Sequence, residues 1–142
     1  DLIIKHIEQY EAYQEKLFAI VDLFINKFFE RRDFQNIIFR EMAMNQRTAM
    51  AEKITVQVHK NFLLAYDIIQ TGIDNKEFKK VDIELTVMSI IGIVRMYTTS
   101  GTMACKILKV EDESEAFGKK QKDRLRKHLR QLLINHLGIE SK

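Results

Sequence analysis

The chain has 142 residues and a net charge of +3, and it contains no proline, no tryptophan, five glycines and one cysteine. With 46% apolar and 30% charged residues it has a globular composition, not a disordered one, and its length suits one domain over residues 1–142. The lone Cys105 excludes an internal disulfide and any multi-cysteine metal site, while the absence of proline favours long helices.

The first segment, residues 2–31, has the spacing of a helix. Its apolar residues recur every three or four positions from Ile3 to Phe28, with one polar gap. This pattern is compatible with one long helix or with two helices joined near residues 12–15. Additional apolar residues in the later half predict burial on more than one side.

Two further helices are expected in the first half of the chain. Asp33 is a candidate N-cap for a short helix over residues 34–44, because its carboxylate can accept from exposed backbone N–H groups. Residues 45–47 are predicted to be a polar joint. A long helix over residues 48–71 follows, and Gly72 is expected to end it in a left-handed conformation.

The fourth expected helix, residues 83–109, is apolar on two sides. Asp82 is its candidate N-cap, and the small residues at 98–101 are expected to kink or fray it. Because a helix that is apolar all round must be covered all round, both faces need a packing partner.

The last expected helix, residues 119–137, follows an acidic loop at 111–115 and ends at Gly138. It has a leucine stripe made of Leu125, Leu129, Leu132, Leu133 and Leu137. Against the single Asp123 it carries the basic residues Lys119, Lys120, Lys122, Arg124, Arg126, Lys127 and Arg130. Such a cluster can attract nucleic acid or an acidic surface. We favour a solvated helix face, because aromatic residues for base stacking are missing there.

Recognisable catalytic and metal-binding motifs are missing from the sequence. Its histidines are His6, His59, His128 and His136. None of them has the Glu-x-x-His or His-Glu-x-x-His spacing of common metal sites. There is also no nucleophile elbow and no glycine-rich phosphate loop. We therefore expect no enzyme activity, no metal and no cofactor.

Several residues of the central helices are candidates for a binding site. All six methionines fall between positions 42 and 103, where they either line an adaptable apolar pocket or fill an ordinary core. His59 and Tyr66 stand two turns apart and could be polar anchors in such a pocket. For Arg95, which interrupts an apolar stretch, three interpretations stay open: an anchor for an anionic ligand, an intersubunit ion pair, or a surface side chain.

No segment has the length of a membrane span. The longest nearly apolar run, residues 85–94, has about half of the roughly 20 residues that a transmembrane helix needs. The N-terminal residues lack the cationic segment and the small-residue cleavage site of a signal peptide. We expect a cytoplasmic protein that does not bind membranes.

The order of the expected helices and the residues at their ends form a recognisable pattern. Its elements are Phe39-Arg40-Glu41 at the end of the short helix, Ile69-Gln70-Thr71-Gly72 closing the long helix, the turn from Asp74 to Phe78, the apolar helix around Ile90-Ile91-Gly92, the leucine-striped last helix and the opening Asp1-Leu2-Ile3. In these elements the chain resembles the C-terminal regulatory domain of the TetR (tetracycline-repressor-like) family of transcription factors.

The resemblance implies an all-α bundle of about five helices that binds a small, largely apolar effector and forms a homodimer through its last two helices. The effector-binding residues would be Phe39, Met42, His59, Phe62, Leu63, Tyr66, Met88, Ile91 and Arg95. The dimer interface would contain Met96, Met103, Leu125, Leu129, Leu132, Leu133 and His136.

In that family a helix-turn-helix domain binds operator DNA. No helix-turn-helix precedes the regulatory helices here, so we expect contact with operator DNA only through a separate N-terminal domain. The chain would then be the regulatory half of a repressor. The alternative is a helical protein–protein interaction module without a small-molecule pocket.

Overall fold

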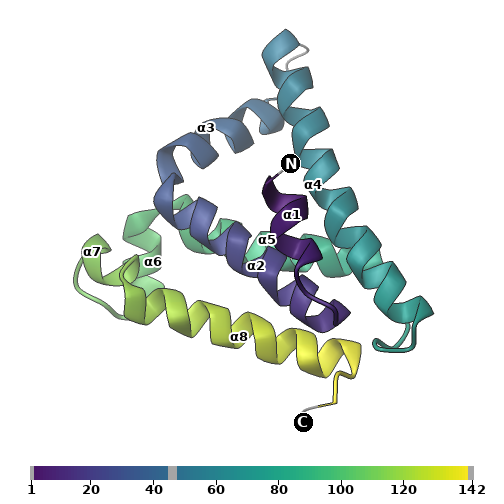
Figure 1. Ribbon diagram of the computed structural model, residues 1–142. Helices are drawn as coiled ribbons and strands as arrows, with labels where there is room; N and C mark the ends of the chain where they lie inside the picture. The colour runs from purple at the N-terminus through teal and green to yellow at the C-terminus, as the bar shows by residue number, and fades with distance from the viewer. Residues whose placement is uncertain (1, 45–47, 141–142) are drawn as a thin grey trace.

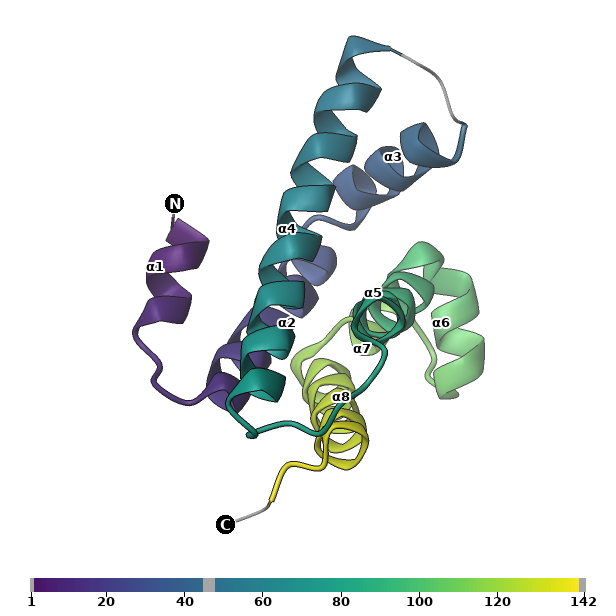
Figure 2. The same ribbon diagram turned by 90° about the vertical axis from the view of Figure 1, so that its right-hand side faces the viewer.

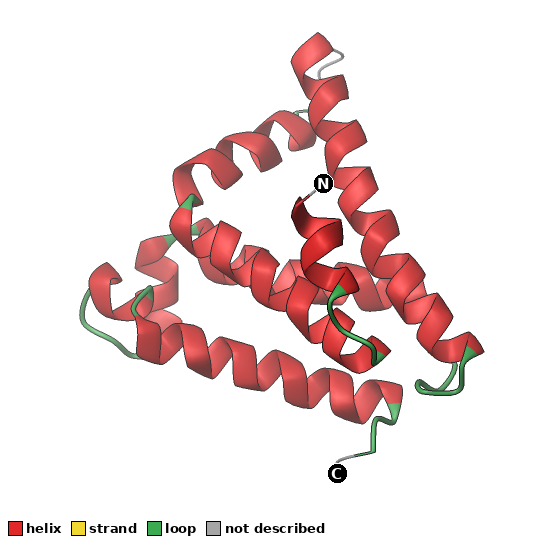
Figure 3. Cartoon of the chain, viewed as in Figure 1, coloured by secondary structure: helices red, strands yellow, loops and turns green. Residues whose placement is uncertain are grey.

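The structure is a computed structural model that describes residues 2–44 and 48–140, and within these ranges the regular secondary structure is entirely helical (Figures 1 and 3). The helices are α1 (Leu2–Glu8), α2 (Tyr13–Glu30), α3 (Arg32–Ala43), α4 (Ala49–Asp74), α5 (Ile83–Thr99), α6 (Gly101–Leu108), α7 (Glu113–Ala116) and α8 (Lys119–Leu137). The all-α prediction is confirmed, with eight helices in the described ranges instead of about five. The polar joint predicted at 45–47 lies outside the described residues. None of the described helices is long and apolar enough to cross a membrane.

Helix α2 is the centre of the fold and packs against α1, α3, α4, α5 and α8. In Figure 1 it crosses the middle of the molecule, with α5 behind it, α4 on one side and α8 on the other. Leu17, Ile20 and Ile25 of α2 are at most 1% exposed. Each such side chain stabilises the fold by roughly 1.5–3 kcal/mol through its burial. The expected burial of this segment on several sides is confirmed.

The first segment consists of two helices. The chain is extended at Ala12, so α1 and α2 are separate. The backbone N–H of Tyr13, at the start of α2, donates to Glu77 Oε2 at 2.9 Å, and this carboxylate comes from the loop between α4 and α5. Of the two alternatives in the sequence, the two-helix one is correct, with the break just before the expected joint.

Of the two predicted N-caps, Asp33 and Asp82, the structure confirms only Asp82. Asp33 is not an N-cap, because α3 begins at Arg32 and its N-cap is Arg31, which directly follows α2 and makes no side-chain cap. Asp33 instead lies in the first turn, where a carboxylate is favoured by the helix dipole. The prediction for Asp82 is confirmed, since its Oδ1 accepts from the backbone N–H of Leu85 at 3.0 Å.

The helix expected over residues 83–109 is interrupted completely. Ser100 is extended and is the N-cap of a new helix, α6, because its hydroxyl accepts from the backbone N–H of Met103. The acidic loop also contains one helical turn, α7, capped by the Asp112 side chain. The left-handed end at Gly138 is confirmed, with φ of 64°.

An aromatic cluster fastens the segment around α7 to α2 and α5. The ring of Tyr97 lies 5.1 Å from that of Phe29 and 5.6 Å from that of Phe117. Its hydroxyl donates to the carbonyl oxygen of Ala116. Burial raises the pKa of Tyr97 to about 12, so this phenol stays protonated at neutral pH.

The expectation for Gly72 is wrong. This glycine lies inside α4, which continues to Asp74, and the left-handed residue that follows is Lys76, with φ of 63°. Its real constraint is tertiary, because a Cβ at Gly72 would lie 2.3 Å from the Phe78 ring. Phe78 is only 3% exposed, so the ring has little room to move.

Gly72→Ala is therefore expected to destabilise the fold by about 1–3 kcal/mol through overpacking, although alanine is normally the better helix former by about 1 kcal/mol. Urea unfolding measures the effect. In a Phe78→Ala background the clash is gone, so the same change should become neutral or stabilising. Equal costs in both backgrounds would refute the Phe78 contact as the cause.

The leucine stripe of α8 packs mainly into the core of its own chain. Leu125, Leu129, Leu133 and Leu137 are 6%, 1%, 3% and 0% exposed, whereas Leu132 is 42% exposed. Leucines four apart lie on one helix face, and Leu132, three residues after Leu129, lies at the exposed edge of that face. The stripe thus has a buried row and one outward member.

Part of the basic cluster of α8 is paired within the fold. Asp22 of α2 accepts from Arg126 Nε at 3.0 Å and from Arg130 Nη2 at 2.8 Å. Arg126 also donates to Asp123 at 2.7 Å. These two arginines hold α8 against α2. The exposed members of the cluster are Lys119, Lys120, Arg124 and Lys127.

Candidate functional site

A cavity of about 340 Å³ lies between α2, α3, α4 and α5. Its apolar lining consists of Phe24, Phe28, Phe34, Ile38, Phe39, Ile54, Val58, Phe62 and Ile91. Its polar lining consists of Lys27, Gln35, Lys53, Gln57 and Asn61. Small-molecule sites typically measure about 300–1,000 Å³, and a cavity of about 150 Å³ is known to hold benzene. The space suits a ligand about the size of two aromatic rings.

Helix α4 builds one wall of the cavity from two parallel rows. The apolar row is Ile54, Val58 and Phe62, and the polar row is Lys53, Gln57 and Asn61. Each row has a spacing of four residues, so its members lie above one another on the helix, and the two rows are adjacent. This wall is therefore amphipathic along its length.

Phenylalanines close the inner part of the cavity. Phe28 of α2 and Phe39 of α3 meet edge to face, with centroids 5.8 Å apart and an interplanar angle of 82°. Phe28 is only 9% exposed. Phe62 continues the aromatic surface along α4, between the rings of His59 and Tyr66.

Arg95 of α5 is held from outside the cavity. Its guanidinium lies 4.5 Å from the centre of the Phe39 ring, and its Nη1 donates to Asn36 Oδ1 of α3. Partial burial lowers the pKa of Arg95 below its ordinary value, because loss of solvation disfavours the charged guanidinium. Asn36 also donates to the carbonyl oxygen of Thr99, so α3 and the end of α5 are joined at two points.

A second concave surface, of about 450 Å³, lies between α5 and α8. The two helices run side by side and are seen nearly end-on in Figure 2. The residues lining this α5–α8 groove are Asp82, Leu85, Thr86, Ser89, Ile90, Ile93, Leu129, Leu132, Leu133 and His136. The Thr86 hydroxyl donates its one proton to the backbone carbonyl of Asp82. It also lies 2.9 Å from His136 Nε2, and in that hydrogen bond the histidine must be the donor.

The outer side of the groove is apolar and exposed. Leu85, Met88 and Met96 of α5 are 58%, 60% and 57% exposed, and all three lie on one face of the helix. Gly92 lies among them, and a Cβ there would meet nothing within 4 Å. An apolar helix face with an accessible backbone favours close contact with another apolar surface.

A family model described as Tetracyclin repressor-like, C-terminal domain, matches residues 10–99, which is more than half of the chain. The matched range runs through α2 to α5 and includes every residue that lines the cavity. The chain belongs to the TetR-like C-terminal domain family. No curated protein and no solved structure gave a significant match. The resemblance seen in the sequence is confirmed, and the chain is the regulatory domain of a TetR-like transcription regulator.

The cavity of this TetR-like domain contains some of the effector-binding residues expected from the sequence. Phe39, Phe62 and Ile91 line it. The remaining expected residues, which do not line it, are Met42, His59, Leu63, Tyr66, Met88 and Arg95. The expectation placed the pocket on the strip of α4 that contains His59, whereas the cavity faces the adjacent strip with Val58.

Several cavity residues of the TetR-like domain were missed in the sequence. Phe24 and Phe28 belong to α2, whose apolar residues all resembled ordinary core. The signal for the α4 wall was present, because the row from Ile54 to Phe62 has clear helical spacing next to a row of amides and Lys53. Periodicity identifies such a face but does not say which helix it opposes.

The residues expected at the dimer interface lie in three environments. Leu125, Leu129 and Leu133 are buried in the core of their own chain. Leu132 and His136 are exposed and line the α5–α8 groove. Met96 and Met103 are exposed on α5 and α6. The buried leucines therefore have almost no surface to offer a partner.

Proposed function

We propose that this TetR-like domain binds a small effector in the cavity between α2, α3, α4 and α5, and that it forms a homodimer through α5 and α8. It would serve as the regulatory half of a transcriptional repressor, with operator DNA contacted by a separate N-terminal domain. The observation that carries the proposal is the double role of α5. One side of this helix places Ile91 in the cavity, and another side exposes Met88 and Met96.

The position of α5 supports a route from the cavity to the dimer. A ligand that changes the packing around Ile91 would shift the helix whose outer face meets the partner, and so favour one arrangement of the dimer over another. Phe39 is a second link between the cavity and α5, because it lines the cavity and its ring contacts the guanidinium of Arg95 on α5. The effector needs only to bind one arrangement more tightly than the other.

The effector cavity is tested by filling it. Val58→Trp adds a large side chain to the lining, while Val56→Trp makes the same change on α4 at a residue that is 56% exposed and outside the lining. With biphenyl-4-methanol as a neutral two-ring probe, calorimetric titration should show binding to the wild type and to Val56→Trp. Val58→Trp should bind at least about tenfold more weakly, which is a difference of about 1.4 kcal/mol.

Circular dichroism of the free proteins shows whether both tryptophan variants fold. Equal binding by the two folded variants would place the probe outside the cavity and refute this part of the proposal. The alternative, an interaction module without a pocket, would be favoured by a tightly filled centre. The cavity of about 340 Å³ favours the effector-binding domain instead.

A further inference from the structure

We propose that the effector is an apolar carboxylic acid whose carboxylate is bound by Lys27 and Lys53 at the mouth of the cavity. This inference rests on the proposed effector cavity and adds the chemical class of its ligand. The starting observation is the charge of the lining. Lys27 of α2 and Lys53 of α4 are cationic, and no aspartate or glutamate is among the described residues that line the cavity.

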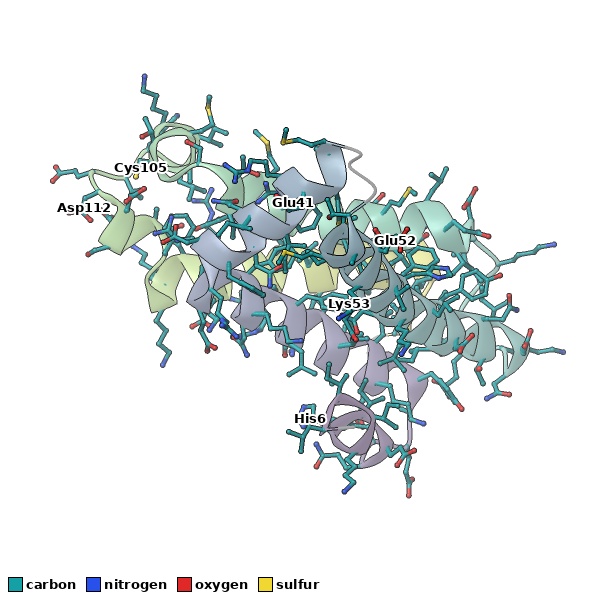
Figure 4. All side chains as sticks on the ribbon, turned by 90° about the horizontal axis from the view of Figure 1, so that it is seen from above. His6, Glu41, Glu52, Lys53, Cys105 and Asp112 are labelled. Carbon is teal, nitrogen blue, oxygen red and sulfur yellow. The ribbon has the colours of Figure 1, made fainter. Side chains whose placement is uncertain are left out.

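No acidic side chain among the described residues pairs with either lysine. Glu52 precedes Lys53, but in Figure 4 it lies on the other side of α4, whereas Lys53 lies on the side of α2. Among the described residues, the side chains of Lys27 and Lys53 make no ion pair and no hydrogen bond. Both ammonium groups are therefore available to a ligand.

A neutral ligand would be a poor match for this lining. Filling the cavity removes water from the neighbourhood of the ammonium groups, and loss of solvation disfavours an unpaired charge. A carboxylate on the ligand compensates for that loss through charge-assisted hydrogen bonds. No arginine is among the described lining residues, so the planar fork that typically binds phosphate is not provided.

The arrangement of the polar residues gives the ligand a direction. Lys27, Lys53 and Gln57 are exposed, so they lie at the open end, whereas Phe28 is buried at the inner end. Gln57 donates to Asn61 Oδ1 at 3.4 Å, which leaves the amide N–H groups of Asn61 free to donate along the same wall. The apolar body would enter first and contact the phenylalanines, with the carboxylate last, beside the lysines.

Three ligands of equal shape test the inference: biphenyl-4-carboxylate, biphenyl-4-methanol and biphenyl-4-methylamine, titrated calorimetrically into the chain at low salt and pH 7. We expect the carboxylate to bind about tenfold or more tightly than the alcohol, and the amine most weakly. The advantage of the carboxylate should shrink as salt is added, because exposed charges are screened.

Lysine variants assign the charge. Lys27→Met with Lys53→Met should reduce the affinity for the carboxylate to that for the alcohol and leave the alcohol unaffected. Lys60→Met is the matched control, since Lys60 is exposed on the same helix as Lys53 and does not line the cavity. It should leave all three affinities unchanged.

The outcomes separate the two proposals. Equal binding of carboxylate and alcohol, or an equal loss in Lys60→Met, overturns the carboxylate inference but leaves the effector cavity standing, provided that Val58→Trp still blocks the probes. If none of the three ligands binds, both the inference and the effector cavity are overturned.

Discussion

Leu132→Glu combined with Met88→Glu is expected to convert a dimer of the TetR-like domain into a folded monomer. Leu132 is 42% and Met88 60% exposed, on α8 and α5 respectively, so both changes are easily tolerated by a single chain. In the proposed interface they would place four carboxylates against apolar surface, where each uncompensated charge costs several kcal/mol. We expect dimerisation to weaken about 100-fold or more.

Light scattering measures the mass of the wild type and the variant across a range of concentrations, and circular dichroism reports on folding. Val56→Glu is the matched control, because Val56 is 56% exposed on α4, away from the α5–α8 groove. It should remain dimeric. A wild type that is a stable monomer, or a double variant with unchanged mass, would rule out the proposed interface.

The second large effect concerns the core row of the leucine stripe. Leu129→Ala is expected to lower the free energy of unfolding by about 2–5 kcal/mol, because it removes a side chain that is 1% exposed and leaves a cavity between α8 and α2. Leu132→Ala, three residues further along α8, should change it by no more than about 0.5 kcal/mol, which is typical of surface positions.

Both alanine variants are best compared in a Met88→Glu background, at a concentration at which light scattering gives the mass of one chain, so that dimerisation does not add to the measured stability. Urea unfolding then reports on the single chain. Similar losses for Leu129→Ala and Leu132→Ala would contradict the division of the stripe into a buried row and an outward member. Because Leu129 and Leu133 are buried in the core of their own chain, aspartate at either position would unfold the chain and would not test the dimer interface.

Local signals predicted the helix ends that depend on neighbouring residues alone. Asp82 caps α5 and Gly138 ends α8 in the left-handed conformation, both as expected. These features depend on hydrogen bonds and backbone torsions within one helical turn. Asp33 failed as an N-cap because the preceding helix ends at the adjacent residue, which a local pattern does not reveal.

The candidate site was only partly predictable for a related reason. Phe39, Phe62 and Ile91, three of the expected effector-binding residues, line the cavity, whereas Arg95 was left with three interpretations. Its partner within the chain, Asn36, is 59 residues away in sequence and belongs to another helix. The pairing of two such residues depends on how α3 crosses α5.

By itself, the sequence determined the all-α class, most of the helices and membership of the TetR-like family, because helical periodicity and capping act over a few residues. Only the tertiary structure decided which faces are covered. It placed Phe78 over Gly72, turned four of the five leucines of α8 inward and left Leu132 outward, and set the lysines of α2 and α4 around one cavity. These facts depend on contacts between helices far apart in the chain, and an amphipathic pattern does not specify its partner.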